Sequence, residues 1–368
     1  MKILIMNQYF EDFMGGSELQ CYMIARYLKK YGHEVIYGAI NSKGNCYKTD
    51  YKIIPIKKLS FFSLRKIFKE VKPDLVYWRY NKSFLLAAGI ICKYFNIKLV
   101  FSVSSIPDTR KWVIIKLPDI KKQGIKRRLK SLIRLFKVFF SGYINYLGYH
   151  FVDGVISVRK GLLQNLPSRG KKFIKTCIYN SMEISPIEEF HWNKPYVIWV
   201  ANVKKNKNPE FYIEAAKKFI DKKVDFIMVG KIQDSSYSFL NDKDNLPKNF
   251  FYLGAKQLEE VNSIIKGSLF LISTCDPEGF SNNLIQAWML GKPTVTLFFD
   301  PDGLIEKYEI GYFSKTFINM CNDINTLIEN KKIRLKIGNQ AKKLASDLFD
   351  PEKNIRKYLK FFEDVFKN

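Results

Sequence analysis

Short apolar runs alternate with segments of helical spacing along almost the whole chain, and this alternation limits the fold more than any other feature. The first unit has an apolar run at 2–6, a loop ending in Gly15-Gly16, apolar residues at helical spacing from 19 to 28, and a second run at 34–39. Two parallel strands need such a crossover between them. The sequence therefore predicts an α/β fold built from βαβ units.

The alternation falls into two halves, separated by a stretch from 173 to 196 that contains Pro186 and Pro195. Further buried strands are predicted at 74–78, 98–103, 154–158, 197–201, 225–229, 250–253, 269–273 and 294–298. We expect two tandem doubly wound Rossmann-like domains, residues 1–185 and 196–349, facing a cleft, with a C-terminal helix at 350–368 that packs back on the first. Ligands of such sheets bind beyond the carboxyl ends of the strands, so the cleft is the expected site.

Composition narrows the class of protein. With 61 Lys and Arg against 35 Asp and Glu, the net charge of +26 indicates an anionic partner such as a phosphate, a nucleic acid or a membrane surface. A hydrophobic content of 47% excludes a disordered chain. The six Cys form no CxxC pair and the three His are scattered, so we expect reduced thiols in a cytoplasmic protein, with no metal site and no cofactor.

The segment 273–293 carries the strongest chemical signal. A predicted strand ends near Ser273, a loop holds Glu278 and Gly279, and a helix with Ser281 as its N-cap follows as far as Leu290. Gly279 permits close approach of the backbone, and amide groups at a helix N-terminus attract anions. This combination suits a diphosphate group.

This segment resembles the Glu-x7-Glu signature of retaining GT-B glycosyltransferases of family 4. The resemblance implies that Glu278 contacts the donor sugar and that the backbone of Gly279, Phe280, Ser281 and Asn282 contacts the diphosphate. The second Glu of the signature, which holds the nucleotide ribose, is replaced by Gln286. The Gln286 amide can still donate and accept hydrogen bonds, but without a charge.

Two further segments resemble the same family. In the loop 201–209, Lys207 stands where the family has a phosphate-binding Lys, Asn202 replaces an Arg, and Lys204 or Lys205 is expected to supply the missing charge. The expected donor site also includes Gly230, which ends the strand at 225–229. At the N-terminus, Gly15 and Gly16 resemble the glycine loop that faces the diphosphate and the acceptor.

Two other segments contain candidate binding residues. Many family members carry a His after a strand in the middle of the first domain, whereas the segment 100–108 has none; Ser104 and Asp108 are the candidates there for the acceptor site. Asp300 and Asp302 form an Asp-x-Asp pair that could hold a divalent metal. Because Pro301 and Gly303 accompany them, we favour a simple turn.

A basic stretch from 110 to 149 has a separate interpretation. Between 110 and 137 it contains eleven basic residues and one acid, Asp119, together with an apolar helical stripe. Such a helix can lie in the interface of an anionic bilayer, or its stripe can face the protein core. We favour the membrane surface, with Arg127, Arg128, Lys130 and Arg134 in contact with it. A protein on the inner face of the plasma membrane is therefore expected, and no apolar run is long enough to span the bilayer.

Together these features predict a retaining hexosyltransferase of bacterial polysaccharide biosynthesis. It would move a sugar from a nucleotide-diphosphate donor to a hydroxyl group of a lipid-linked or surface-glycan acceptor, with Glu278 and Lys207 as the catalytic residues. A nucleotide-sugar epimerase with the GT-B architecture is the alternative enzyme. A basic nucleic-acid-binding protein is the alternative of another class, although no aromatic RNP-like strand, zinc module or helix-turn-helix is recognisable; nucleic acid is therefore not among the expected partners.

Overall fold

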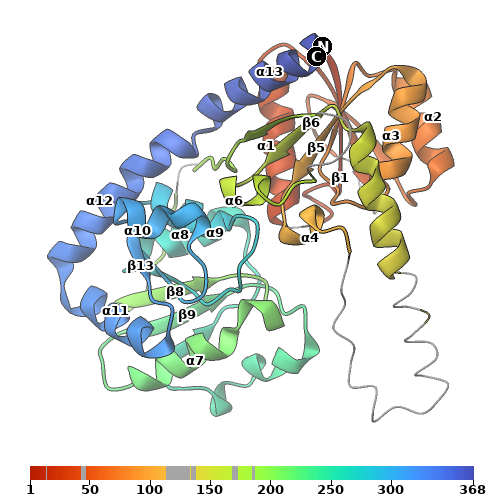
Figure 1. Ribbon diagram of the computed structural model, residues 1–368. Coiled ribbons are helices and arrows are strands. Elements are labelled where there is room, and N and C mark those ends of the chain that lie inside the picture. Colours follow the sequence, from red (N-terminus) through yellow and green to blue (C-terminus); the bar gives the residue numbers. More distant parts are fainter. Residues whose placement is uncertain (14, 43–46, 113–132, 134–137, 168–172, 185–186) are drawn as a thin grey trace. The chain divides into compact units, whose positions relative to one another are not determined.

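The chain forms two compact units, each with its own parallel β-sheet and hydrophobic core (Figure 1). The first unit contains Met1–Tyr179 and Asn354–Asn368, and the second contains Asn180–Lys353. The computed structural model describes residues 1–13, 15–42, 47–112, 133, 138–167, 173–184 and 187–368. Within these residues, no helix is both long enough and apolar enough to cross a bilayer.

The sheet of the first unit has seven described strands, all parallel, in the order β3-β2-β1-β4-β5-β6-β7. Its strands are β1 (Lys2–Asn7), β2 (Glu34–Ile40), β3 (Lys52–Ile56), β4 (Leu75–Trp78), β5 (Lys98–Val103), β6 (Gly154–Ser157) and β7 (Ile174–Cys177). Helices α1 (Gly16–Lys30), α2 (Phe61–Val71), α3 (Leu85–Phe95), α4 (Ile106–Thr109) and α6 (Lys160–Leu163) connect them. The strand order reverses between β1 and β4, as in a doubly wound sheet.

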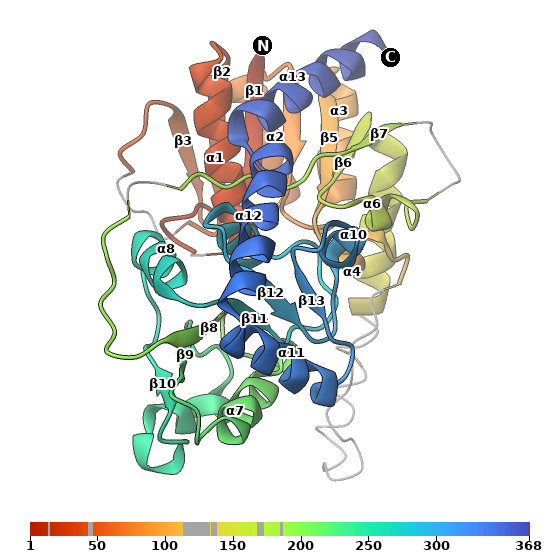
Figure 2. The same ribbon diagram turned by 90° about the vertical axis from the view of Figure 1, so that its left-hand side faces the viewer.

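The last helix of the chain belongs to the first unit. α13 (Pro351–Lys367) lies across the first sheet in Figure 2 and contributes buried side chains to its core. These are Ile355, Tyr358, Phe361, Phe362 and Val365. Gly154 of β6 lies directly beneath, because a Cβ atom there would come within 2.7 Å of Val365. Asn354 Nδ2 also donates to the carbonyl oxygen of Tyr179 (3.3 Å), so the two segments of the first unit meet where the chain leaves it and returns to it.

The second unit repeats the architecture with six described parallel strands in the order β10-β9-β8-β11-β12-β13. They are β8 (Tyr196–Val200), β9 (Asp225–Val229), β10 (Phe250–Tyr252), β11 (Leu271–Ser273), β12 (Thr294–Thr296) and β13 (Gly311–Phe313). The main helices are α7 (Pro209–Lys218), α8 (Leu258–Gly267), α9 (Asn282–Met289), α10 (Leu304–Tyr308), α11 (Phe317–Glu329) and α12 (Lys331–Leu348). Here the order reverses between β8 and β11.

The predicted fold class is confirmed, because both units have parallel sheets with the helices and reversals of a Rossmann-like domain. Three strands were not predicted: β3, β7 and β13. All three lie at an outer edge of a sheet. β7 falls within the stretch that the sequence indicated as a linker, and the chain passes into the second unit only after Tyr179.

Candidate functional site

The reversal of strand order in the second unit brings two loops together. β8 and β11 are neighbours in the sheet, yet β8 is followed by α7 and β9 on one side and β11 by α9 and β12 on the other. Loops that leave a parallel sheet in opposite directions form a crevice at the carboxyl ends of the strands, where ligands of such sheets bind. Lys207 lies on the loop after β8, and Glu278 lies on the loop after β11.

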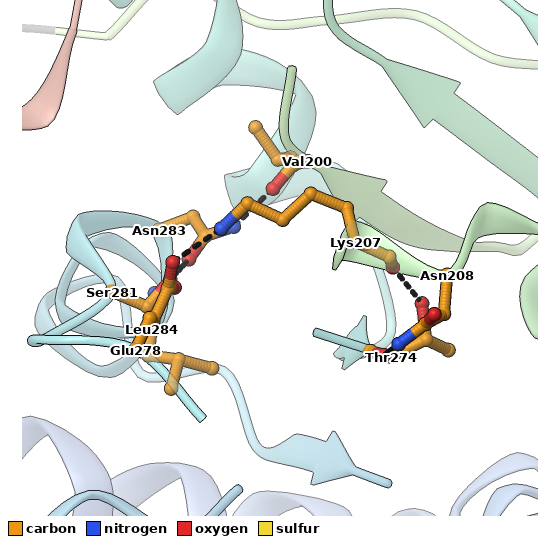
Figure 3. Close-up of polar contacts among 8 residues, drawn as sticks. All are labelled: Val200, Lys207, Asn208, Thr274, Glu278, Ser281, Asn283 and Leu284. Carbon is orange, nitrogen blue, oxygen red and sulfur yellow. Dashed lines mark hydrogen bonds and ion pairs between the residues drawn. The ribbon is translucent and has the colours of Figure 1, made fainter. Parts of the chain in front are cut away.

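Lys207 and Glu278 contact each other directly across this position (Figure 3). The Lys207 ammonium group donates to Glu278 Oε2 in an ion pair. The Lys207 side chain is 12% exposed and the Glu278 side chain is 25% exposed. The structure thus brings together the two residues that the sequence indicated as catalytic, and each remains partly accessible to a ligand.

Hydrogen bonds between the two loops fix the position of Lys207. Thr274 Oγ1 donates to the carbonyl oxygen of Lys207 (2.7 Å) and accepts from Trp199 Nε1 (3.0 Å). Asn208, whose φ of 46° lies in the left-handed region, donates to the carbonyl oxygen of Thr274 (3.1 Å) and to Asp276 (2.9 Å). Sequence reasoning did not single out Thr274 or Asn208, because no spacing rule marks such loop contacts.

Electrostatics keep Lys207 charged in spite of its burial. Burial is the largest single influence and alone would lower the pKa of its ammonium group, but the contacts with Glu278 and Cys275 together outweigh it and the pKa is raised. The neighbouring Cys275 shows the opposite balance, because burial raises the pKa of its thiol and keeps it neutral. The position therefore presents one fixed positive charge beside one carboxylate.

The start of α9 is held by Asn283 rather than by Ser281. Ser281 occupies the N-cap position, as predicted, but its side chain makes no capping bond and its hydroxyl instead contacts Asn283 Oδ1. Asn283 Nδ2 donates to the carbonyl oxygen of Val200 at the end of β8, and its Oδ1 accepts from the Leu284 amide (2.9 Å). The first turn of α9 is thereby tied to the strand that precedes Lys207.

The side chains around this turn have mainly structural partners. Phe280 is 8% exposed and packs edge-on against Trp288 and Phe349, so only its backbone is available to a ligand. Gly279 is buried beside it. Asn282 Oδ1 accepts from Asn180 Nδ2 (2.8 Å) within the same unit.

Gln286 is almost entirely buried, with 5% exposure, and its Nε2 donates to Asn262 Oδ1 of α8 (2.8 Å). Sequence reasoning missed Asn262. The only available signal was a polar residue within the buried stripe of α8, which also contains Val261 and Ile264. Asn262 orients the Gln286 amide where the resembled family has a carboxylate.

The remaining predicted donor residues lie at the carboxyl ends of β8 and β9. Gly230 adopts a φ of 152°, and a Cβ atom there would lie 1.7 Å from the carbonyl oxygen of Ala201, so the two loop backbones require a glycine at this contact. Asn202 follows Ala201 and is half-buried, as is Lys204. Lys205 is exposed.

Asp300 and Asp302 lie in a turn, as the sequence predicts. The Asp300 carboxylate accepts from the amides of Ile305 (2.9 Å) and Glu306 (3.1 Å), and Asp302 adopts a left-handed φ of 53°. Glu306 pairs with Lys315 (2.7 Å). These bonds explain the Asp-x-Asp pattern as the local chemistry of a helix start.

The first unit places Gly15 and Gly16 at the corresponding reversal point. Gly15 is the N-cap residue of α1, which follows β1, and a Cβ atom on Gly15 would collide with the Glu18 carboxylate at 2.2 Å. Arg79 follows the neighbouring β4, is 1% exposed, and donates to the Tyr77 hydroxyl (3.3 Å). Sequence reasoning missed this buried arginine.

The acceptor candidates of the first unit have different surroundings. Asp108 is 2% exposed and accepts from the amides of Ser104 (3.2 Å) and Ser105 (3.0 Å) and from the Ser105 hydroxyl (2.7 Å). Burial raises the pKa of its carboxyl group. Asp108 therefore shapes this turn, whereas the Ser104 side chain is half-buried. Arg127, Arg128, Lys130 and Arg134 lie outside the described residues.

Comparison with known proteins finds a family match within the second unit. Residues 181–344 match the family model of glycosyl transferases group 1. An uncharacterised glycosyltransferase of Methanocaldococcus jannaschii is 27% identical over 202 residues, which are 50% of this chain and 52% of that protein. The chain thus spans about half the length of this curated relative.

Solved structures show the fold of the whole chain. Anabaena HepE, solved in complex with UDP and glucose, is 17% identical with a TM-score of 0.71 over 99% of this chain and 100% of that one. A glycosyltransferase from Rickettsia africae is 16% identical with a TM-score of 0.75, covering 100% and 98% of the two chains. At such identities the likeness shows the GT-B fold alone.

Proposed function

We propose that this protein is a glycosyltransferase that moves a sugar from a nucleotide diphosphate to an acceptor hydroxyl group. The contact between Lys207 and Glu278 carries the proposal. It places one cation and one carboxylate at the strand-order reversal of the unit that matches a glycosyltransferase family. The cation can bind a diphosphate, and the carboxylate can accept hydrogen bonds from the hydroxyl groups of a sugar.

The chemistry follows from these charges. The bond between the anomeric carbon and the diphosphate oxygen breaks, and its electron pair stays on the diphosphate. Lys207 and the N-terminal turn of α9 stabilise that charge, and Glu278 orients the donor sugar and balances its cationic character. The acceptor oxygen then bonds to the anomeric carbon, and its proton passes to the departing phosphate. Donor binding separates the ion pair, because each partner gains a group of the substrate.

The finer assignments rest on the family resemblance and on the surface of the first unit. The Glu278 segment favours retention and a hexosyl donor, and HepE, which shares the fold, was solved with UDP and glucose. The basic stretch favours a lipid-linked or surface-glycan acceptor of bacterial polysaccharide biosynthesis, at the inner face of the plasma membrane. In its described part, Trp112 stacks on Phe139 with ring centroids 4.3 Å apart, and Phe140 is 62% exposed.

A matched pair of variants tests the role of Glu278. A thermal-shift screen of nucleotide diphosphates and their sugars first identifies the donor, since a ligand stabilises the folded state that binds it. Glu278→Gln should then lower nucleotide-diphosphate release by about a hundredfold or more, the scale seen when a group that stabilises the transition state is removed. The affinity for the nucleotide diphosphate should not fall in this variant, because no carboxylate then competes with the diphosphate for Lys207.

Glu329→Gln is the control, because Glu329 forms a solvent-exposed ion pair with Lys222 (2.6 Å) in the same unit. Its turnover should remain within about twofold of the wild-type value, as an exposed pair contributes little. Equal turnover in Glu278→Gln and wild type would remove Glu278 from the mechanism. An epimeric nucleotide sugar formed without free nucleotide diphosphate would instead support the epimerase.

A further inference from the structure

A separate cavity of about 720 Å³ lies at the outer edge of the second sheet. It is bordered by β13 and by helices α10, α11 and α12, and among the described residues its lining includes none from the loops that carry Lys207 and Glu278. Its volume falls within the range of small-molecule sites. Because β13 is the last described strand of the sheet, one edge of its backbone borders this space instead of another strand.

The lining offers hydrogen-bond donors and acceptors side by side. The Asp323 carboxylate accepts from the Ser314 hydroxyl (2.6 Å), and Gln340 Nε2 donates to Glu309 (3.4 Å). Gln340 Oε1 is shielded from solvent and has no hydrogen-bond partner within the described part of the chain. Asn322 and Lys336 are exposed at the rim. A ligand with many small polar groups would satisfy this arrangement.

The rest of the wall is apolar. Ile305 and Ile337, with exposures of 0% and 8%, and the half-buried Ile333 line the space together with the ring of Tyr312. The lining therefore combines polar and apolar groups. Saccharides combine them too, because they carry hydroxyl groups at the edges of the ring and C–H groups on its faces.

The charges of the lining disfavour an anionic ligand. Three carboxylates, those of Glu306, Glu309 and Asp323, line the cavity with one cation, Lys336; Glu306 is paired with Lys315, which leaves two carboxylates against one cation. This acidic balance is unusual on a chain of net charge +26. A nucleotide or an anionic headgroup would meet repulsion here, whereas an uncharged ligand would not.

We propose that this cavity binds an uncharged oligosaccharide, as a second site distinct from the Lys207–Glu278 position. The choice of a saccharide as occupant rests in part on the proposed function, because a glycosyltransferase of that kind works on glycan chains. Such a site would hold the acceptor or product glycan to the second unit and raise its local concentration.

Saturation-transfer NMR on the full chain tests this proposal with four neutral probes: maltotetraose, cellotetraose, mannotetraose and chitotetraose. At least one should bind the wild-type protein. Asn322→Trp, which places a large ring at the rim, and Lys336→Ala should weaken that binding at least tenfold. Asn339→Trp is the matched control, because Asn339 is an exposed residue of α12 outside the lining, and it should bind the probe as the wild type does.

Binding of the donor nucleotide diphosphate, measured on the same samples, separates this proposal from the proposed function. If the nucleotide binds but none of the four probes does, the proposed saccharide site is refuted and the proposed function is unaffected. If a probe binds equally well to Asn322→Trp and Lys336→Ala, it occupies another place and the proposal fails. If a probe binds the wild type and Asn339→Trp, and its binding is weakened only in Asn322→Trp and Lys336→Ala, the site is supported even where the protein binds no nucleotide.

Discussion

Lys207 and Lys292 of the second unit are both shielded from water, but different groups surround them. Lys207 faces the Glu278 carboxylate, which raises its pKa against the effect of burial. Lys292 donates to the carbonyl oxygen of Ser268 (2.7 Å); its burial, together with the positive charges of Arg334 and Lys266, lowers its pKa to about 8. The first lysine is kept as a cation for a ligand, and the second carries a charge that destabilises the folded state.

Lys292→Met should therefore raise the melting temperature at pH 7, on the order of 2–4 °C. Because the folded-state pKa of Lys292 lies below that of the unfolded chain, the penalty is complete below about pH 8 and fades as the pH rises toward the unfolded value. The gain in Lys292→Met should thus be smaller at pH 9.5 than at pH 7. Lys343→Met, at an exposed lysine of α12, is the control. An equal gain at both pH values would contradict the assignment.

Single residues also mark the limit of sequence-based prediction. The Glu278 segment and the Lys207 loop could be identified because their residues follow strands and glycines at recognisable spacings. Arg79, Asn262 and Thr274 could not. Arg79 reads as an ordinary charged residue after a strand although it is buried, and Asn262 and Thr274 take their roles from partners distant in the sequence. Ser281 shows the converse, since a suitable residue at the N-cap position can bond elsewhere.

At the scale of elements, the predicted strands are those with uninterrupted apolar residues, which parallel strands covered on both faces require. The strands that were missed, β3, β7 and β13, lie at sheet edges and expose part of their side chains. β3 even contains Pro55, which an edge strand tolerates because its missing amide need not pair. Three of the four described edge strands were therefore missed, whereas the fourth, the wholly apolar β10, was predicted.

The helix at 138–147 leads to a prediction about membranes. Phe139 and Phe140 are 42% and 62% exposed, and Lys111 lies 5.2 Å from the ring of Trp112, which stacks on Phe139. We expect the protein to float with vesicles that contain phosphatidylglycerol, and less so as salt increases, since each basic residue near such a surface contributes about 1 kcal/mol.

Replacing both Phe139 and Phe140 by Ser should reduce this flotation severalfold, because the apolar contact is removed while the basic charges stay. Ile318→Ser is the control, as Ile318 is 74% exposed but lies in the second unit. Flotation that is unaffected by salt and by the double variant would show that the helix does not contact the membrane. Phosphatidylcholine vesicles serve as the uncharged reference.

At the scale of the whole molecule, the two units differ in how the chain builds them. The second is a single continuous stretch, whereas the first needs both ends of the chain. α13 contributes five large buried side chains to the first core, each worth roughly 1.5–3 kcal/mol of burial. Their sum is comparable with the entire stability of a typical domain, about 5–15 kcal/mol.

Residues 180–353 produced alone should therefore unfold cooperatively, whereas residues 1–179 should show no cooperative transition. Adding residues 351–368 to the fragment 1–179, through a flexible linker, should restore one. Circular dichroism during thermal unfolding measures all three. A cooperative transition in 1–179 alone would mean that α13 is dispensable for the first core.

The placement of α13 also has a consequence for biosynthesis. Many proteins complete their N-terminal part while the rest of the chain is still being made. Here the sheet of the first unit stays without α13 until residues 351–368 have been synthesised, whereas residues 180–353 of the second unit precede that helix in the chain. A chain that ends between residues 351 and 368 would therefore lack part of the helix that the first core needs.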